Sequence, residues 1–180
     1  MTEKEIIEGC TNGNASCQRL LFEQYAGKFM SVCLRYANDA MEAEDMLQEA
    51  FIRIFSNVQK FKFEGSFEGW MRRIVVNVAL KHLQKKKIRF NDMTEKNMHA
   101  QATLSEQAYS HLGEIELMKL ISGLPKGYRI IFNLNVIEGY SHEEIAKMLK
   151  IKASTSRSQL VKARKMLQQQ ILQLRKIAVE

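Results

Sequence analysis

The chain has 180 residues, 46% of them hydrophobic, and a formal net charge of +7, which fits one globular domain or two small ones with an anionic partner. Nine glycines and a single proline among many helix-forming residues indicate an all-α fold. Short apolar runs exclude a membrane span, and three cysteines without a C-x-x-C pair argue against a zinc site or a disulfide framework.

The first predicted helix covers roughly residues 16–36, where apolar residues recur at three- and four-residue intervals. We expect its core side to consist of Leu20, Leu21, Phe29, Val32 and Tyr36. Asn38 and Asp39 then interrupt the pattern. Asp39 followed three residues later by Glu42 resembles a capping box, which predicts the start of a second helix.

The second predicted helix runs from Asp39 to about Lys60 and carries acidic residues but no basic ones at positions 41–49. Its core stripe is predicted to be Ala43, Leu47, Ala50, Phe51, Ile54 and Val58. When this stripe faces inward, one outer face is formed by Asp45, Gln48, Glu49 and Ile52. Acidic side chains around an exposed isoleucine fit a protein partner with a basic, partly apolar surface. A solvated helix surface explains this face equally well.

A third helix is predicted after the loop with the sequence FKFEGSFEG. Polar and aromatic side chains follow one another along it at three- and four-residue steps, namely Trp70, Arg73, Asn77, Lys81 and Gln84. No acidic residue occurs at positions 69–91, which hold seven Lys or Arg. Such a stripe offers the stacking, base-edge hydrogen bonds and positive charge that bind single-stranded nucleic acid. A core tryptophan beneath an exposed polar stripe explains this segment alone equally well.

Residues 91–112 are polar, mixed in charge and weakly periodic, which predicts a flexible linker between two domains. The alternative is one irregular helix within a single domain. Beyond this segment the helical pattern returns. Gly123 and Pro125 separate two helices, and Gly139 closes the second of them.

The C-terminal part is predicted to end in a helix-turn-helix, whose second helix enters the major groove of DNA. Ser141 with Glu144 forms a capping box for a short helix over residues 142–150, and Ser154 or Thr155 is expected to cap a long basic helix. Side chains that suit bases or phosphates open the long helix, namely Ser154, Thr155, Ser156, Arg157, Ser158, Gln159, Lys162, Arg164 and Lys165. A plain helical hairpin with a solvated basic face is the alternative.

Three motifs occur in the order and spacing of a known family: EAEDMLQEAFIRIF, FEGSFEGWMRRIVVNVALKHLQKKK and LPKGYRIIFNLNVIEGYSHEEIAKML. With them the chain resembles the two-domain, extracytoplasmic-function (ECF) class of bacterial RNA polymerase sigma factors, over roughly residues 17–172. The resemblance implies an N-terminal sigma domain at residues 1–90, a linker at 91–112 and a C-terminal helix-turn-helix domain at 113–180.

The resemblance also implies the partners and the residues that bind them. Core polymerase would be bound by Asp45, Gln48, Glu49, Ile52 and Arg53. The melted, single-stranded non-template strand of the −10 promoter element would be bound by Phe63, Ser66, Phe67, Trp70, Arg73, Asn77, Lys81, Lys85, Lys86 and Lys87. In the family, a flipped base enters a pocket formed by the loop, assisted by the asparagine position. The duplex −35 element would be read by Ser141, Ser154, Thr155, Ser156, Arg157, Ser158, Gln159, Lys162 and Arg164.

The start of the predicted recognition helix departs from the family pattern. Many relatives carry Gly-Thr-Val where this chain has Ser154, Thr155 and Ser156, so the −35 preference of relatives does not transfer. Two partners stay open: an anti-sigma factor that holds the chain inactive, and another recruiting protein that places the polymerase.

We therefore expect a cytoplasmic sigma factor that directs core polymerase to promoters and stabilises the melted −10 strand. A free-standing helix-turn-helix regulator is the alternative function. An enzymatic role, such as a nuclease, would need clustered carboxylates as metal ligands beside the basic surfaces, and the sequence offers no such cluster. We expect no catalytic residue, no metal and no cofactor.

Overall fold

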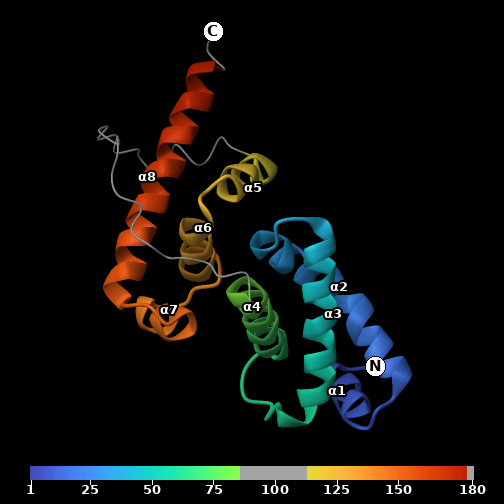
Figure 1. Cartoon of the computed structure of the whole chain (residues 1–180). Helices are drawn as coiled ribbons and strands as arrows, with labels where there is room; N and C mark the ends of the chain where they lie inside the picture. Colours follow the sequence, from blue (N-terminus) through green and yellow to red (C-terminus); the bar gives the residue numbers. More distant parts are fainter. Residues whose placement is uncertain (86–112, 178–180) are drawn as a thin grey trace. The chain divides into compact units, whose positions relative to one another are not determined.

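The computed structural model describes residues 1–85 and 113–177 (Figure 1). The chain divides into two compact units, Met1–Lys87 and Ile88–Glu180. Every regular element in the described ranges is helical, which confirms the predicted all-α fold with two helical domains. The predicted linker at 91–112 lies outside the described residues.

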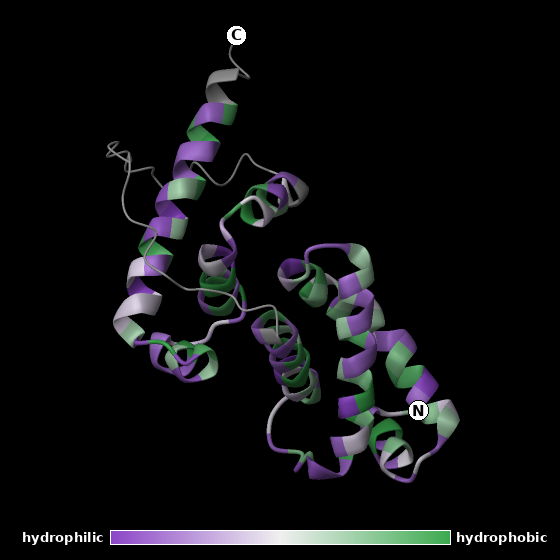
Figure 2. Cartoon of the chain, viewed as in Figure 1, coloured by the Kyte–Doolittle hydropathy of each residue, from purple (hydrophilic) through white to green (hydrophobic). Residues whose placement is uncertain are grey.

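The N-terminal unit consists of four α-helices and a short 3₁₀ turn in the part that the structure describes. These are α1 (Glu3–Thr11), α2 (Ala15–Tyr36), α3 (Ala40–Asn57), η1 (Val58–Lys60) and α4 (Phe67–Lys85). Helices α2, α3 and α4 each pack against the other two, while α1 packs against α2 and η1. Figure 2 shows hydrophobic and hydrophilic positions alternating along these helices, as expected for amphipathic packing.

The core of the N-terminal unit follows the predicted stripes with one exception. All six residues of the second predicted stripe are buried, five on α3 and Val58 on η1, and so are Leu21, Phe29, Val32 and Tyr36 of α2. Leu20, in contrast, is 41% exposed. It lies one residue, or about 100° around the helix, from Leu21, which occupies the core position.

Helix α1 was not predicted from the sequence, although it begins with a capping box. The Glu5 amide donates to Thr2 Oγ1 over 3.3 Å, and the Thr2 amide donates to Glu5 Oε2 over 2.7 Å. The helix buries Ile6, Ile7 and Cys10. Apolar side chains of this size contribute about 1.5–3 kcal/mol each when fully buried, so this packing stabilises a helix that is too short to be stable alone.

The C-terminal unit contains α5 (Glu114–Ser122), α6 (Lys126–Phe132), a π-helical turn η3 (Asn133–Ile137), α7 (His142–Leu149) and α8 (Ala153–Ile177). Helix α8 contacts α5, α6 and α7. Part of the core of the C-terminal unit is a cluster of buried apolar residues, namely Ile121, Leu124, Ala163 and Leu167. A second group of fully buried residues, Ile130, Ile131, Leu134 and Ile145, comes from α6, η3 and α7.

The predicted turn signals of the C-terminal unit have clear structural roles. Gly139, two residues after the end of η3, has a φ of 78°, a left-handed conformation that glycine adopts without strain. The Ser141 box is formed as predicted, because the Glu144 amide donates to Ser141 Oγ over 3.2 Å and the Ser141 amide donates to Glu144 Oε2 over 2.8 Å. Helix α7 then ends at Leu149, and Lys150 is left-handed with a φ of 56°.

The start of α8 differs from the prediction. The helix begins at Ala153, so Ser154 and Thr155 lie within its first turn and not at the capping position. The amide of Ser156 already donates to the carbonyl of Lys152 over 3.1 Å. The capping position is Lys152, so the prediction that Ser154 or Thr155 caps this helix was wrong by two or three residues.

Candidate polymerase-binding and nucleic-acid interfaces

The outer face of α3 carries three of the predicted polymerase-binding residues in the open. Asp45 and Gln48 are exposed, and Ile52 is 65% exposed although it is a large apolar residue. These positions are separated by three and four residues, so they lie on one side of the helix. We call Asp45, Gln48 and Ile52 the docking face. Its acidic residue at one end and exposed apolar residue at the other are suited to a protein surface more than to DNA.

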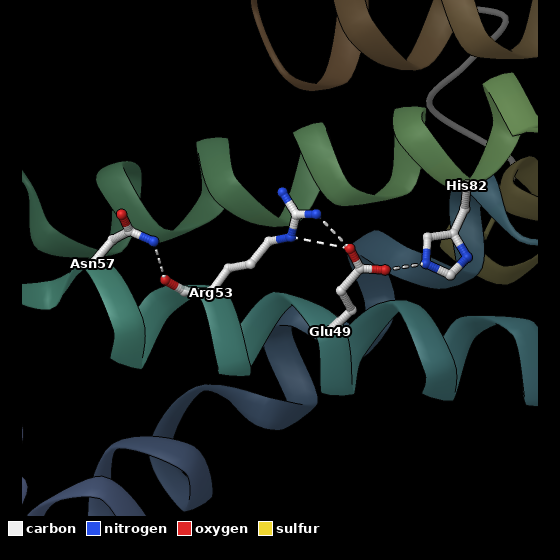
Figure 3. A network of polar contacts seen from close by, with 4 residues as sticks. All are labelled: Glu49, Arg53, Asn57 and His82. Atoms are coloured by element: carbon white, nitrogen blue, oxygen red, sulfur yellow. Dashed lines mark hydrogen bonds and ion pairs between the residues drawn. The ribbon is translucent and has the colours of Figure 1, made fainter.

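Two further residues predicted to bind polymerase, Glu49 and Arg53, are instead engaged within the unit (Figure 3). Glu49 Oε1 accepts hydrogen bonds from Arg53 Nη2 over 2.6 Å and from Arg53 Nε over 3.0 Å. Glu49 Oε2 lies 2.6 Å from Nε2 of His82 on α4. The hydrogen bond from His82, followed by Arg53, lowers the pKa of Glu49. The carboxylate therefore stays ionised and is directed toward α4.

The loop between η1 and α4 contains residues with a left-handed backbone and an exposed aromatic ring. Phe63 has a φ of 58°, which a non-glycine residue seldom adopts, and its side chain is 52% exposed. Gly65 follows with a φ of 86°. Ser66 then caps α4, because its hydroxyl accepts the amide of Gly69 over 3.2 Å.

Four aromatic rings surround this loop. The ring centroid of Phe61 lies 5.2 Å from Phe63, 5.0 Å from Phe67 and 5.8 Å from Trp70, and Phe67 stacks on Trp70 at 5.6 Å. Phe67 is only 1% exposed. The prediction that Phe67 contacts DNA therefore does not agree with its burial, since its ring supports Phe61 and Trp70 from within the core.

A hollow of about 220 Å³ lies between α1, η1 and the loop, and its lining includes Glu8, Asn12, Phe61 and Phe63. Asn77, which was predicted to assist base capture, is not among the lining residues. Helix α1 therefore contributes polar side chains next to the exposed loop, a contribution that the sequence did not indicate.

The predicted stripe on α4 is present on its surface. Arg73, Asn77 and Lys81 are exposed, and Trp70 is half-buried at one end of the stripe. Three helical turns separate Trp70 from Lys81, a length of about 16 Å. The stripe therefore combines an aromatic edge, an amide and two cations along one line. Ser66 is exposed at the start of α4, Lys85 is its last residue, and Lys86 and Lys87 lie outside the described residues.

In the C-terminal unit, α7 and α8 form the predicted helix-turn-helix, held by the buried side chains of Ile145, Leu149 and Leu160. The solvent-exposed side of the first turns of α8 carries Ser154, Arg157, Ser158, Val161 and Arg164. Thr155 and Lys162 are partly exposed beside it. Ser141 lies at the start of α7, where its hydroxyl caps the helix.

Two of the predicted DNA-contacting residues of α8 are buried. Ser156 is 0% exposed, and its hydroxyl lies 2.8 Å from Nδ1 of His142 on α7. Gln159 is 2% exposed. These side chains hold the interior of the unit, so the prediction that they touch DNA does not agree with the structure.

Arg157 and Val161 complete the exposed face of α8 in ways the sequence did not reveal. Arg157 Nη1 is paired with Glu143 Oε1 of α7 at 3.0 Å. A hydrogen bond from its own backbone amide and the one from Arg157 lower the pKa of Glu143. Val161 is 65% exposed between Ser158 and Arg164 and was missed as a candidate. Because it is apolar yet exposed, it is suited to contact a methyl group of a base.

Within residues 1–85 and 113–177, no three His, Cys, Asp or Glu side chains gather as metal ligands would. None of the helices searched in these ranges is long and apolar enough to cross a membrane. Cys10, Cys17 and Cys33 are free and buried, and burial raises the pKa of Cys10 to about 11 and that of Cys33 to about 12.

Comparison with known proteins gives matches to both units. Residues 21–88 match the family model of Sigma-70 region 2, and residues 114–167 match that of Sigma-70, region 4. The RNA polymerase sigma-H factor of Pseudomonas aeruginosa is 30% identical, with 90% of this chain and 90% of that protein covered. The ECF RNA polymerase sigma factor SigE of Mycolicibacterium smegmatis is 35% identical, with 82% of this chain and 58% of that protein covered.

A solved structure shares the fold. The sigma factor RpoE from Bartonella quintana, in complex with the anti-sigma factor NepR, matches with a TM-score of 0.53 and 19% identity. The match covers 86% of this chain and 96% of that one.

Proposed function

The chain belongs to the ECF class of bacterial RNA polymerase sigma factors, and from this premise we propose how its residues divide the work of initiation. As a sigma factor it partners core RNA polymerase and promoter DNA, and it directs the polymerase to promoters. We propose that it acts in the cytoplasm, where the polymerase works, and that it catalyses no reaction itself.

The docking face of α3 binds the largest subunit of core polymerase in this proposal. The exposure of Ile52, at 65%, is the observation that supports it most strongly, because a large aliphatic side chain one turn beyond Gln48 gains free energy when a partner covers it. The carboxylate of Asp45 favours a basic surface and orients the approach.

The loop and the α4 stripe bind the melted −10 strand. Phe63 offers an exposed ring for stacking, Asn77 offers an amide for base edges, and Arg73 and Lys81 offer charge for phosphates. The hollow beside Phe63 receives an unstacked base. Since Phe67 is buried, it acts by supporting the loop and not by touching DNA.

The exposed side of α8 reads the duplex −35 element in the major groove. Arg157 and Arg164 can contact guanine edges or phosphates, while Ser154 and Ser158 suit phosphates. Val161, in the middle of this side, is suited to the methyl group of thymine. We assign no base contact to Ser156 or Gln159, because both are buried.

An anti-sigma factor is also proposed as a partner. The structural relative from Bartonella quintana was solved with one, and the docking face of α3 is a surface that such a protein could cover. An inhibitor bound there would compete with core polymerase.

Two single changes should separate polymerase binding from strand capture. We expect Asp45→Lys to lower the affinity for core polymerase about tenfold, because it places a cation opposite a basic surface. Asn77→Ala should leave that affinity within about twofold but lower open-complex formation about tenfold, because it removes a base-edge hydrogen bond. The measurements are binding of labelled chain to core polymerase and permanganate footprinting on a promoter found by mapping transcript starts after induced expression.

Glu23→Lys serves as the control for charge reversal, since Glu23 is exposed on α2 and its ion pair with Arg19 lies within that helix. If Asn77→Ala lowers core binding and open-complex formation equally, the base-capture role is wrong. Tight duplex binding by the chain alone, without association with core polymerase, would support the free-standing regulator instead.

A further inference from the structure

Glu49 lies in the sequence among the docking residues, yet its carboxylate faces the neighbouring helix. Both oxygens have partners at hydrogen-bonding distance: Oε1 accepts from Arg53, and Oε2 meets His82 Nε2 at 2.6 Å. The exposed fractions of the Glu49 and His82 side chains are 29% and 20%. These bonds already use most of the acceptor capacity of the carboxylate, so direct docking is a poor role for it.

His82 connects this carboxylate to the helix that carries the DNA-binding stripe. It follows Lys81 directly and lies five residues after Asn77 on α4. Helices α3 and α4 pack together and bury apolar residues such as Ala50, Ile54 and Ala79, but apolar packing favours contact without fixing direction. A charge-assisted hydrogen bond is short and directional, so it fixes how the two helices are aligned along their axes.

The same line of contacts continues along α3 as far as Asn57 (Figure 3). Asn57 Nδ2 donates to the carbonyl of Arg53 over 2.8 Å, and Lys60 Nζ donates to Asn57 Oδ1 over 2.7 Å. Phe61, the first residue of the loop, follows Lys60 directly. We call Glu49, Arg53, Asn57, Lys60 and His82 the polar seam.

We infer that Glu49 and His82 are positioning residues, and that the polar seam holds α4 and the Phe63 loop in a fixed register with the docking face. The inference rests on the proposed function, because it assigns those two surfaces to polymerase and to the −10 strand. Polymerase binding through Asp45, Gln48 and Ile52 would then deliver Asn77 and Phe63 to the DNA in one orientation. Without the seam, both surfaces remain intact but their relative position is less well defined.

The test compares His82→Ala with His82→Gln in holoenzyme assembled from core polymerase and the full chain. We expect His82→Ala to keep core affinity within about twofold and to lower open-complex formation on a duplex promoter about tenfold, as expected for losing a hydrogen bond to a charged group. A promoter with a pre-melted −10 region should reduce this defect to about threefold or less, since capture no longer has to drive melting. His82→Gln can still donate to Glu49 and should restore most of the activity.

Glu23→Ala is the matched control, because it removes an ion pair of 2.8 Å with Arg19 that lies within α2 alone. It should change neither core affinity nor open-complex formation. The fluorescence of Trp70, the only tryptophan, reports whether each variant keeps the aromatic cluster folded.

Three outcomes would overturn the inference: unchanged open-complex formation in His82→Ala, an equal loss of core affinity, or no difference between the Ala and Gln variants. A His82→Ala variant that does not fold would leave His82→Gln and Glu49→Gln as the deciding pair, with near-normal activity expected for the first and a loss for the second. Asn77→Ala in the same assay tests the proposed function separately. If it has no effect, strand capture by α4 fails whatever His82 does.

Discussion

The two units use their polar side chains differently. In the N-terminal unit, the stripe on α4 remains exposed while separate residues, Glu49 and His82, link the helices. In the C-terminal unit, neighbouring residues at the start of α8 divide these roles. Ser156 and Gln159 are buried inside the unit, while Arg157 and Ser158 are exposed on its surface.

The size of the helix contacts explains this difference. Helices α2, α3 and α4 are 18 to 22 residues long, so they bury enough apolar surface to leave whole polar stripes to solvent. Helix α7 has eight residues, and a small interface leaves part of its packing to polar side chains such as His142 and Ser156. A short DNA-binding hairpin therefore offers fewer free contacts than its sequence suggests.

The largest effect is expected on stability, where replacing a buried ring of the aromatic loop is compared with replacing its exposed ring. Phe61→Ala should lower the free energy of unfolding of the N-terminal unit by about 3 kcal/mol, because the buried ring touches Phe63, Phe67 and Trp70. Phe63→Ala should lower it by less than about 1 kcal/mol, since that ring is half exposed. Urea unfolding followed by Trp70 fluorescence measures both.

Phe63→Ala should nevertheless impair open-complex formation, because it removes the exposed ring, whereas any loss in Phe61→Ala includes the effect of destabilising the unit. Equal destabilisation by the two changes would show that Phe63 is part of the core. This unit would then not separate exposed binding residues from buried stabilising residues.

A smaller effect is expected for the buried serine of the C-terminal unit. Ser156→Val should destabilise that unit by about 1–3 kcal/mol, because it removes the partner of His142 and adds volume at a fully buried position. Ser158→Ala, two residues away and exposed, should change stability by less than about 0.5 kcal/mol. Hydrogen exchange of the α7 and α8 amides in the full chain resolves this unit from the other.

The unfolding transition of Trp70 should be the same in both serine variants, since that residue belongs to the other unit. If Ser156→Val retains full protection of α7 and α8 yet loses duplex binding, Ser156 contacts DNA and the division of tasks along α8 is wrong.

The smallest effect concerns the exposed ion pair between Glu143 and Arg157. Glu143→Gln should raise the affinity for duplex promoter DNA about two- to fivefold, because it removes an acidic competitor for Arg157 and a charge that repels phosphates. Competition binding of holoenzyme on a duplex probe measures the change. The gain should shrink at higher salt, and the matched exposed change Lys147→Gln should not produce it.

Much of the fold could be predicted because long amphipathic helices carry strong periodicity. The core stripe of α3 and the capping box at Ser141 followed directly from residue spacing. Helix α1 was missed because nine residues give a weak periodic signal, although Thr2 with Glu5 was a readable capping box. A search for such boxes alone would have found it.

The candidate interfaces were harder to predict, because orientation and pairing depend on helix phase and on neighbours distant in sequence. Residues 154–159 have no apolar member, so their phase is fixed only by extending the buried series Leu160, Ala163 and Leu167 backward, which brings Ser156 to the core side. The contact between Glu49 and His82 joins residues 33 positions apart, and no local pattern reveals it.

At Phe63, the left-handed backbone is unfavourable for folding with any residue but glycine, whereas the proposed stacking on DNA requires an aromatic ring. A glycine would adopt the φ of 58° without steric strain, which costs an ordinary residue about 1–2 kcal/mol. Glycine would also leave the strand without a ring to stack on. In the proposed function, the stacking contact of the half-exposed Phe63 ring is therefore gained at a cost in folding free energy, which the buried rings of the core do not carry.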